Sequence, residues 1–152
     1  MLQSTITEPL PSDADAIRRL MAEVIEHDVT QDRALLADTL ANVNGNVDIW
    51  LSEPARCVHL VARIEERIDG VVLMKDFWNL CSLFVASNVQ GQGIGRELVE
   101  AAAARCKGQG TERALCLNAA TAAIPFYRQL GFVERRAARP LPPGFLAMHR
   151  PL

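Results

Sequence analysis

Three glycines at alternate positions form the part of the sequence best suited to hold a ligand. The stretch reads Gln90-Gly91-Gln92-Gly93-Ile94-Gly95-Arg96 and lies between an apolar run and a helical pattern. Glycine lets a chain turn tightly and lets its backbone approach a ligand closely. The helix that follows directs its free N–H groups and the positive end of its dipole toward the turn. The spacing therefore indicates an anion site suited to phosphate, since a plain helix start would need only one glycine.

Two common phosphate-binding motifs fit this turn poorly. A Walker loop ends in Gly-Lys-Ser/Thr, but Arg96 and Glu97 follow Gly95 here. A dinucleotide fingerprint that begins at Gly91 and Gly93 needs its third glycine at position 96, which is arginine. That fingerprint also follows the first strand of a fold, whereas this turn lies past the middle of the chain. An ATP site built on the same turn is kept as a rival hypothesis.

The hydrophobic pattern predicts the elements that position this turn, in the order β-α-α-β-β-β-α-β-α-β-β. Strands are expected at residues 3–9, 57–64, 68–75, 79–86, 113–118, 132–138 and 145–150. Helices are expected from about residue 12, at 32–43, at 93–107 and at 121–130, with Asn44-Gly45-Asn46 ending the second. The order predicts an α/β (α+β) fold in a single domain over residues 1–152. Its mixed, mostly antiparallel sheet would have six to seven strands, with about four helices on its two faces.

Composition excludes several classes of protein. The chain has 152 residues, of which 49% are hydrophobic, and 16 basic against 18 acidic side chains give a net charge of −2. A chain of this length buries roughly 70% of its unfolded surface and needs no disulfide or metal, and it lacks the basic excess of nucleic-acid-binding proteins. The longest uncharged run, residues 77–95, is too polar in its second half to span a membrane.

The cysteines and the N-terminus indicate the compartment. The four cysteines lack C-x-x-C spacing and the three histidines are scattered, which predicts reduced core cysteines and no metal site. The first residues lack the basic and apolar regions of a signal peptide. We therefore expect a cytoplasmic protein.

The glycine turn belongs to the first of two blocks that carry a family signature. Residues 85–95 read Val-Ala-Ser-Asn-Val-Gln-Gly-Gln-Gly-Ile-Gly, and residues 123–132 read Ala-Ile-Pro-Phe-Tyr-Arg-Gln-Leu-Gly-Phe. The first block resembles the acetyl-CoA loop V-x-P-x-x-R/Q-G-x-G-x-G/A of the GCN5-related N-acetyltransferases (the GNAT family), with Ser87 in place of proline. The second resembles the family's A-x-x-F-Y-x-x-L-G-F block. The resemblance covers residues 79–134 and implies the GNAT fold, whereas the first 56 residues agree only in element order.

The resemblance implies acetyl-CoA as co-substrate and assigns positions to it. In the family, the strand before the loop carries a bulge and separates from the next strand, and the pantetheine arm lies in the gap. By position, the backbones of Leu83, Phe84 and Val85 would bond that arm, with an N–H near Leu83 or Phe84 facing the thioester oxygen. Backbone N–H groups from residues 90 to 96 would hold the pyrophosphate. The Arg96 side chain would either add charge there or be an ordinary solvated helix residue. Asn118 would either bond the pantetheine amides or simply end its strand.

The sole tyrosine of the chain, Tyr127, matches the position where the family usually keeps a tyrosine near the cofactor sulfur. That match implies a general acid, while a core aromatic on an amphipathic helix is the alternative. A phenol titrates near 10 and a thiol near 8.5, so full proton transfer to a thiolate is uphill by roughly 2 kcal/mol. Tyr127 would avoid this cost by donating a hydrogen bond to the departing sulfur, with complete proton transfer following later.

No residue matches the general base that some relatives carry at the start of the central strand, because Asn79 stands there. A water chain or an acceptor amine of low pKa would remove the need for a base. By chemistry alone the remaining candidates are Asp76, His59, Glu26 and His27.

By analogy with the family, the acceptor should lie between the second helix and the closing hairpin. Aromatic residues that could line an apolar part of that site, or could equally belong to the core, are Trp50, Phe77 and Trp78. Basic residues that could hold an acidic substrate or the 3′-phosphate of the cofactor, or could form a solvated surface, are Arg135, Arg136 and Arg139.

Together these features predict an acyl-CoA-dependent N-acyltransferase that moves an acetyl group to a primary amine of a small molecule or peptide. The amine would attack the thioester directly while both substrates are bound, because no Cys or Ser is set up as a nucleophile. The alternative is a non-catalytic CoA-binding sensor or regulatory module. The sequence selects neither the acceptor nor the acyl group, and it leaves open whether the chain forms a homodimer.

Overall fold

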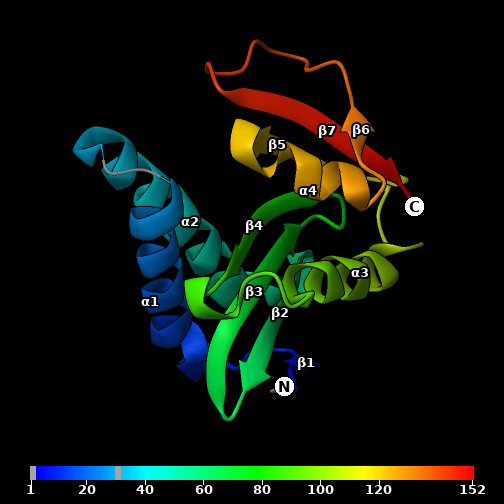
Figure 1. The fold of residues 1–152 in the computed structure, drawn as a ribbon. Coiled ribbons are helices and arrows are strands. Elements are labelled where there is room, and N and C mark those ends of the chain that lie inside the picture. Colours follow the sequence, from blue (N-terminus) through cyan, green and yellow to red (C-terminus); the bar gives the residue numbers. More distant parts are fainter. Residues whose placement is uncertain (1–2, 30–31) are drawn as a thin grey trace.

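Seven strands form one sheet in the computed structural model, which describes residues 3–29 and 32–152 (Figure 1). Their order across the sheet is β1-β2-β3-β4-β5-β7-β6, and all neighbours are antiparallel except β4 and β5. The strands are β1 (Thr5–Thr7), β2 (Cys57–Ile64), β3 (Arg67–Lys75), β4 (Asn79–Val85), β5 (Ala114–Ala120), β6 (Val133–Glu134) and β7 (Phe145–Pro151). The predicted mixed sheet is confirmed.

Helices cover both faces of the sheet, as predicted (Figure 1). The α-helices are α1 (Ala14–Val24), α2 (Arg33–Ser52), α3 (Ile94–Cys106) and α4 (Ile124–Gln129). Short turns of other helix types are η1 (Pro11–Asp13), η2 (Ile25–Val29), η3 (Pro54–Arg56), η4 (Ser87–Val89) and η5 (Thr121–Ala123). One apolar core lies between the sheet and α1 and α2, and the other contains the buried faces of α3 and α4. No helix in the described part of the chain is long and apolar enough to cross a bilayer.

The second helix extends nine residues past its predicted end, since α2 ends at Ser52 and not at residue 43. Asn44-Gly45-Asn46 does not stop it. Val43, Val47 and Trp50 are buried one turn apart against α1 and the sheet, so tertiary packing outweighs the poor helix propensity of this stretch. The strand predicted at 132–138 is also shorter, because β6 pairs with β7 only at Val133 and Glu134.

Strands β4 and β5 are adjacent in the sheet but share very little backbone pairing. They pair at one position, Asn79 with Cys116, where the Cys116 N–H donates to the Trp78 carbonyl at 2.7 Å. On its other side β4 pairs with β3 from Asn79 to Val85, with a register shift that leaves Cys81 as the extra residue. A bulge of this kind bends its strand and increases its twist. The two parallel strands therefore diverge beyond Asn79, and the backbone of β4 facing β5 has no strand partner there.

Replacing Gly45 with alanine should stabilise the fold, because the glycine lies inside α2 and an added Cβ meets no atom within 4 Å. Alanine loses less backbone entropy on folding, so we expect the free energy of unfolding to rise by about 0.5–1 kcal/mol. Urea denaturation followed by circular dichroism measures this change.

Gly144→Ala is the matched control. An added Cβ also meets nothing within 4 Å there, but φ is +87°, a conformation that alanine adopts at a cost. The two variants should change stability in opposite directions. A loss of stability in Gly45→Ala would contradict a continuous helix at this position.

Candidate active site

The glycine turn leaves the first amides of α3 without side-chain partners. Gly91 and Gly93 have φ of +82° and +85°, a region that glycine enters freely, and an added Cβ on either would point into open space. Gly93 is the N-cap of α3 and provides no side-chain cap. The N–H groups of the first turn are therefore available to an anion at the positive end of the helix dipole.

A third glycine, Gly95, serves packing. A Cβ there would lie 3.2 Å from Cζ of Phe126, which comes from α4. The close approach brings α4 against the start of α3, and with it Tyr127, the next residue of α4. The three glycines thus have two different purposes.

A cavity of about 550 Å³ lies where β4, the glycine turn and α4 meet, and we call it the cleft. Ten of the twelve predicted site residues line it, namely Leu83, Phe84, Val85, Gln90, Gly91, Gly93, Ile94, Gly95, Arg96 and Tyr127. The unpaired edge of β4, the free amides of α3 and the only tyrosine therefore open into one space. Gln92 is exposed beside it, and Asn118 lines a different cavity. Their roles toward a cofactor stay predictions.

Tyr127 is buried and neutral over a wide pH range. Its side chain is 8% exposed, and burial raises its pKa to about 12. Its ring makes edge-to-face contacts with Phe126 at 5.1 Å and Phe132 at 5.5 Å. Within the described part of the chain no group accepts or donates a hydrogen bond at its hydroxyl, so the O–H is available to a ligand in the cleft.

An aspartate that the sequence did not single out holds the loop between β4 and α3. Oδ2 of Asp28, from η2, accepts hydrogen bonds from Ser87 Oγ at 3.0 Å and from Gln90 Nε2 at 2.9 Å. The same Gln90 nitrogen donates to the Val85 carbonyl at 2.9 Å. A hydrogen bond with His27, followed by those from Ser87 and Gln90, lowers the pKa of Asp28. The serine that replaces the family's proline thus has a structural partner.

None of the four candidate bases lines the cleft. Asp76 is bound by Arg56 through two hydrogen bonds, which lower its pKa, and Glu26 and His27 are exposed. His59 is 4% exposed, and burial lowers its pKa to about 4. It is a neutral core side chain that packs edge-to-face on Trp50 at 4.3 Å.

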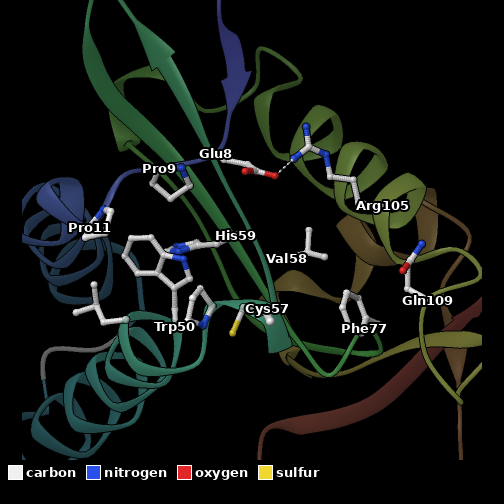
Figure 2. A pocket seen from close by; sticks show the side chains of 13 residues that line it. Glu8, Pro9, Pro11, Trp50, Cys57, Val58, His59, Phe77, Arg105 and Gln109 are labelled. Atoms are coloured by element: carbon white, nitrogen blue, oxygen red, sulfur yellow. Dashed lines mark hydrogen bonds and ion pairs between the residues drawn. The ribbon is translucent and has the colours of Figure 1, made fainter.

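The predicted aromatic lining of the acceptor site is not where the sequence analysis placed it. Trp50 and Phe77 line a separate cavity of about 430 Å³ beside the first residues of β2, together with His59 (Figure 2). An ion pair of 2.9 Å between Glu8 and Arg105 crosses this cavity, as Figure 2 shows. Trp78 lines neither this cavity nor the cleft. The reason is that α2 continues past its predicted end and places Trp50 against β2.

The arginine cluster also lies outside the cleft, because none of Arg135, Arg136 and Arg139 lines it. The Arg135 backbone N–H bonds the Ala147 carbonyl of β7, on the far side of β5 from β4. Arg96 is the only basic side chain of the cleft lining. Among the described residues no cluster of three or more His, Cys, Asp or Glu is arranged to hold a metal ion.

Removing the Asp28 carboxylate should loosen the loop that follows β4. Asp28→Ala loses both hydrogen bonds to the loop, and we expect unfolding free energy to fall by about 1 kcal/mol and amide exchange at residues 87–91 to accelerate. Hydrogen exchange with mass spectrometry measures the second effect.

His27→Ala is the control, because it leaves both bonds from Asp28 to the loop in place. Since the pKa of Asp28 is lowered in the folded state, its stabilisation is present above the unfolded pKa of about 3.8 and is lost as pH falls through the folded value. Unchanged exchange at residues 87–91 in Asp28→Ala would contradict the contact.

Comparison with known proteins agrees with this geometry. The family model described as Acetyltransferase (GNAT) domain matches residues 53–139. A search of curated proteins finds no match. Solved structures of this fold include a PaiA N-acetyltransferase from Thermoplasma acidophilum in complex with coenzyme A, with a TM-score of 0.79 and 13% identity over 99% of this chain and 100% of that one.

Two further structures are similar over nearly the whole length. A GCN5-related N-acetyltransferase from Rhodopseudomonas palustris has a TM-score of 0.79 and 17% identity over 100% of this chain and 98% of that one. A ribosomal-protein-alanine N-acetyltransferase from Brucella melitensis has a TM-score of 0.71 and 22% identity over 97% of this chain and 99% of that one. At these identities the likeness shows the fold, and the family model adds the sequence signature. The chain belongs to the GCN5-related N-acetyltransferase (GNAT) family.

Proposed function

We propose that this protein transfers an acetyl group from acetyl-CoA to a primary amine by direct attack, with both substrates bound at β4. One observation carries the proposal. The cleft brings together the unpaired end of β4, the free amides of α3 and the hydroxyl of Tyr127, and these are the three groups that a bound thioester with a pyrophosphate would need.

The residues present fit coenzyme A. Leu83–Val85 pair with β3 on one side, and on the side that faces β5 their backbone groups have no strand partner, although the Val85 carbonyl accepts from Gln90 Nε2. The amides of a pantetheine arm are complementary to such groups. A Cβ at Gly91 or Gly93 would project into open space. Because glycine has no Cβ, that space can admit a phosphate close to the backbone. Arg96 adds a positive charge; it makes no ion pair among the described residues, and its field contributes to the lowered pKa of Glu100. When bound, acetyl-CoA supplies an activated acyl group, and its C–S bond breaks as the C–N bond to the amine forms.

Each group of the chain then has a role in the reaction. An N–H of β4 at Leu83 or Phe84 stabilises the charge that develops on the carbonyl oxygen. The O–H of Tyr127 donates a hydrogen bond to the sulfur as it leaves. Because its pKa is about 12, full transfer to a thiolate of ordinary pKa near 8.5 would be uphill by about 5 kcal/mol, which favours donation over complete transfer. The proton of the amine leaves to water.

Ligand binding gives the first test. Acetyl-CoA or CoA at about 100 times its Kd should raise the unfolding free energy by about 2.7 kcal/mol, visible as a shift in Tm, whereas ATP and NAD should not. Gly93→Ala should raise the Kd for CoA by tenfold or more, because its φ of +85° disfavours alanine and the methyl group would occupy the phosphate side of the loop.

Gly144→Ala carries comparable backbone strain at φ +87° away from the cleft, so its Kd for CoA should be unchanged. A Tm raised by ATP but not by CoA would refute the proposal in favour of a nucleotide-binding protein.

Removing the Tyr127 hydroxyl gives the second test. Tyr127→Phe should lower kcat by about 100-fold, measured as free thiol released with an amine panel, because the departing sulfur loses its donor. The Kd for CoA and the Tm should hardly change, since the ring contacts with Phe126 and Phe132 remain. Because the phenol stays protonated up to a pH of about 12, the wild-type rate should not fall between about pH 8 and pH 10.

CoA binding without thiol release from any amine would favour the non-catalytic sensor module. An unchanged kcat in Tyr127→Phe would remove the catalytic role of this residue while leaving the acyltransferase proposal in place.

A further inference from the structure

A further cavity, of about 370 Å³ and separate from the cleft and from the cavity of Trp50, lies beside β4 at the point where β4 and β5 begin to diverge. Asparagines from three elements line it, and we call it the asparagine cavity. Its lining residues are Asn42, Asn46, Lys75, Asn79, Leu80, Cys81, Asn118, Leu141, Pro142 and Phe145. Leu80 and Cys81 of β4 line this cavity, and Leu83, two residues further on, lines the cleft. The position between α2 and the β6–β7 hairpin is the one expected for the acceptor.

The charge of the asparagine cavity is carried by one side chain, Lys75. No carboxylate or imidazole lines it, and the Cys81 thiol is neutral because burial raises its pKa. Lys75 is half-buried, and among the described residues its Nζ contacts only Oδ1 of Asn46, at 3.5 Å. An ammonium has three donors, and burying a cation without an anionic partner is unfavourable. Lys75 therefore has the capacity for a further, negatively charged partner.

Strand pairing and a fixed turn position the backbone of Lys75. Lys75 and Asn79 are directly paired across β3 and β4, so their side chains lie on the same face of the sheet. The turn between them has positive φ at Asp76 and Phe77, and Arg56 fixes it with hydrogen bonds of 2.9 and 3.1 Å to the Asp76 carboxylate. The Asp76 carboxylate is hydrogen-bonded to Arg56, and its interaction with the neighbouring Lys75 is Coulombic only, with no ion pair between the two side chains.

The asparagines of α2 are poorly explained by helix stability. Asn42 and Asn46 lie one turn apart in a stretch, Asn42-Val-Asn-Gly-Asn46, made largely of weak helix formers. Asn46 is 8% exposed, a position where an apolar residue would stabilise the core. Local rules are broken most often at functional sites, and here the polar side chains face a cavity whose lining includes one cation and no carboxylate.

We propose that the acceptor is an amine that also carries a carboxylate, with Lys75 binding the carboxylate and the carboxamides of the asparagine cavity orienting the remainder. The inference rests on the proposed acetyl transfer and adds the substrate class. A second ammonium on the acceptor, as in a polyamine, would meet Lys75 with like charge and no acidic side chain to offset it. A carboxylate accepts charge-assisted hydrogen bonds from the ammonium and from amide N–H groups.

An acceptor panel with matched charges tests the substrate class. α-, β- and γ-amino acids are compared with their own carboxamides and with diamines of equal length, with thiol release from acetyl-CoA as the readout. At least one amino acid should have a kcat/KM about tenfold or more above that of its carboxamide and of the diamine. Faster turnover of diamines or carboxamides would overturn the inference and leave acetyl transfer standing. Thiol release from no acceptor would instead count against the proposed function.

The second arm uses the two lysines of the chain, Lys75 and Lys107. Lys75→Gln should lower kcat/KM for the preferred amino acid by about 10- to 100-fold, mostly by raising KM. The kcat/KM for the carboxamide of that amino acid should stay within about twofold of the wild-type value. Lys107→Gln, exposed at the end of α3, is the matched control and should change neither. The Kd for CoA should be equal in all three proteins. Equal losses for the amino acid and its carboxamide would show a structural role for Lys75 and overturn the inference.

Discussion

The site depends on one constraint, which is that β4 and β5 pair at a single position in the middle of a continuous sheet. Each strand is well held on its other side, β4 by β3 and β5 by seven paired residues of β7. The two halves of the sheet therefore keep their order while they diverge from the Asn79–Cys116 pair. An edge of backbone groups without partners is unfavourable inside a protein, and a ligand with amides of its own can satisfy it. The bulge at Cys81 adds twist where the strands separate.

The loop after β4 is fixed by a carboxylate, yet it adjoins amides suited to an anion, and a negative charge nearby opposes anion binding. Asp28 places a negative charge at the edge of the cleft, near amides that would bind phosphate. Its Oδ2 is engaged by Ser87 and Gln90, and His27 contacts Oδ1. The carboxylate is thus used to fix the loop, while the free amides of α3 and the Arg96 side chain face the open space. A proline at position 87 would stiffen the loop through its own ring, and serine achieves this through a partner.

Much of this arrangement was accessible from the sequence because it is local. The glycine turn, the strand before it and the helix after it are contiguous, so their pattern predicts both structure and placement in the cleft. Asp28 lies about sixty residues from the loop it holds, and no local pattern could reveal that contact. The length of α2 was missed because burial of Val47 and Trp50 outweighs the helix-breaking character of Asn44-Gly45-Asn46. In the longer helix Trp50 packs against β2 and lines a separate cavity, while Asn42 and Asn46 line the asparagine cavity.

The asparagine cavity also bears on how an amine could lose its proton, because no carboxylate or imidazole among the described residues lines it. In an amino acid free in water, the carboxylate stabilises the nearby ammonium and raises its pKa. If Lys75 binds that carboxylate, its charge offsets the stabilisation, and the pKa of the bound amine falls. A larger fraction of the amine is then neutral near pH 7, and water can accept the proton. The residue that selects the acceptor would in this way also take over part of the task of the general base that is missing at Asn79, which faces Lys75 on the neighbouring strand.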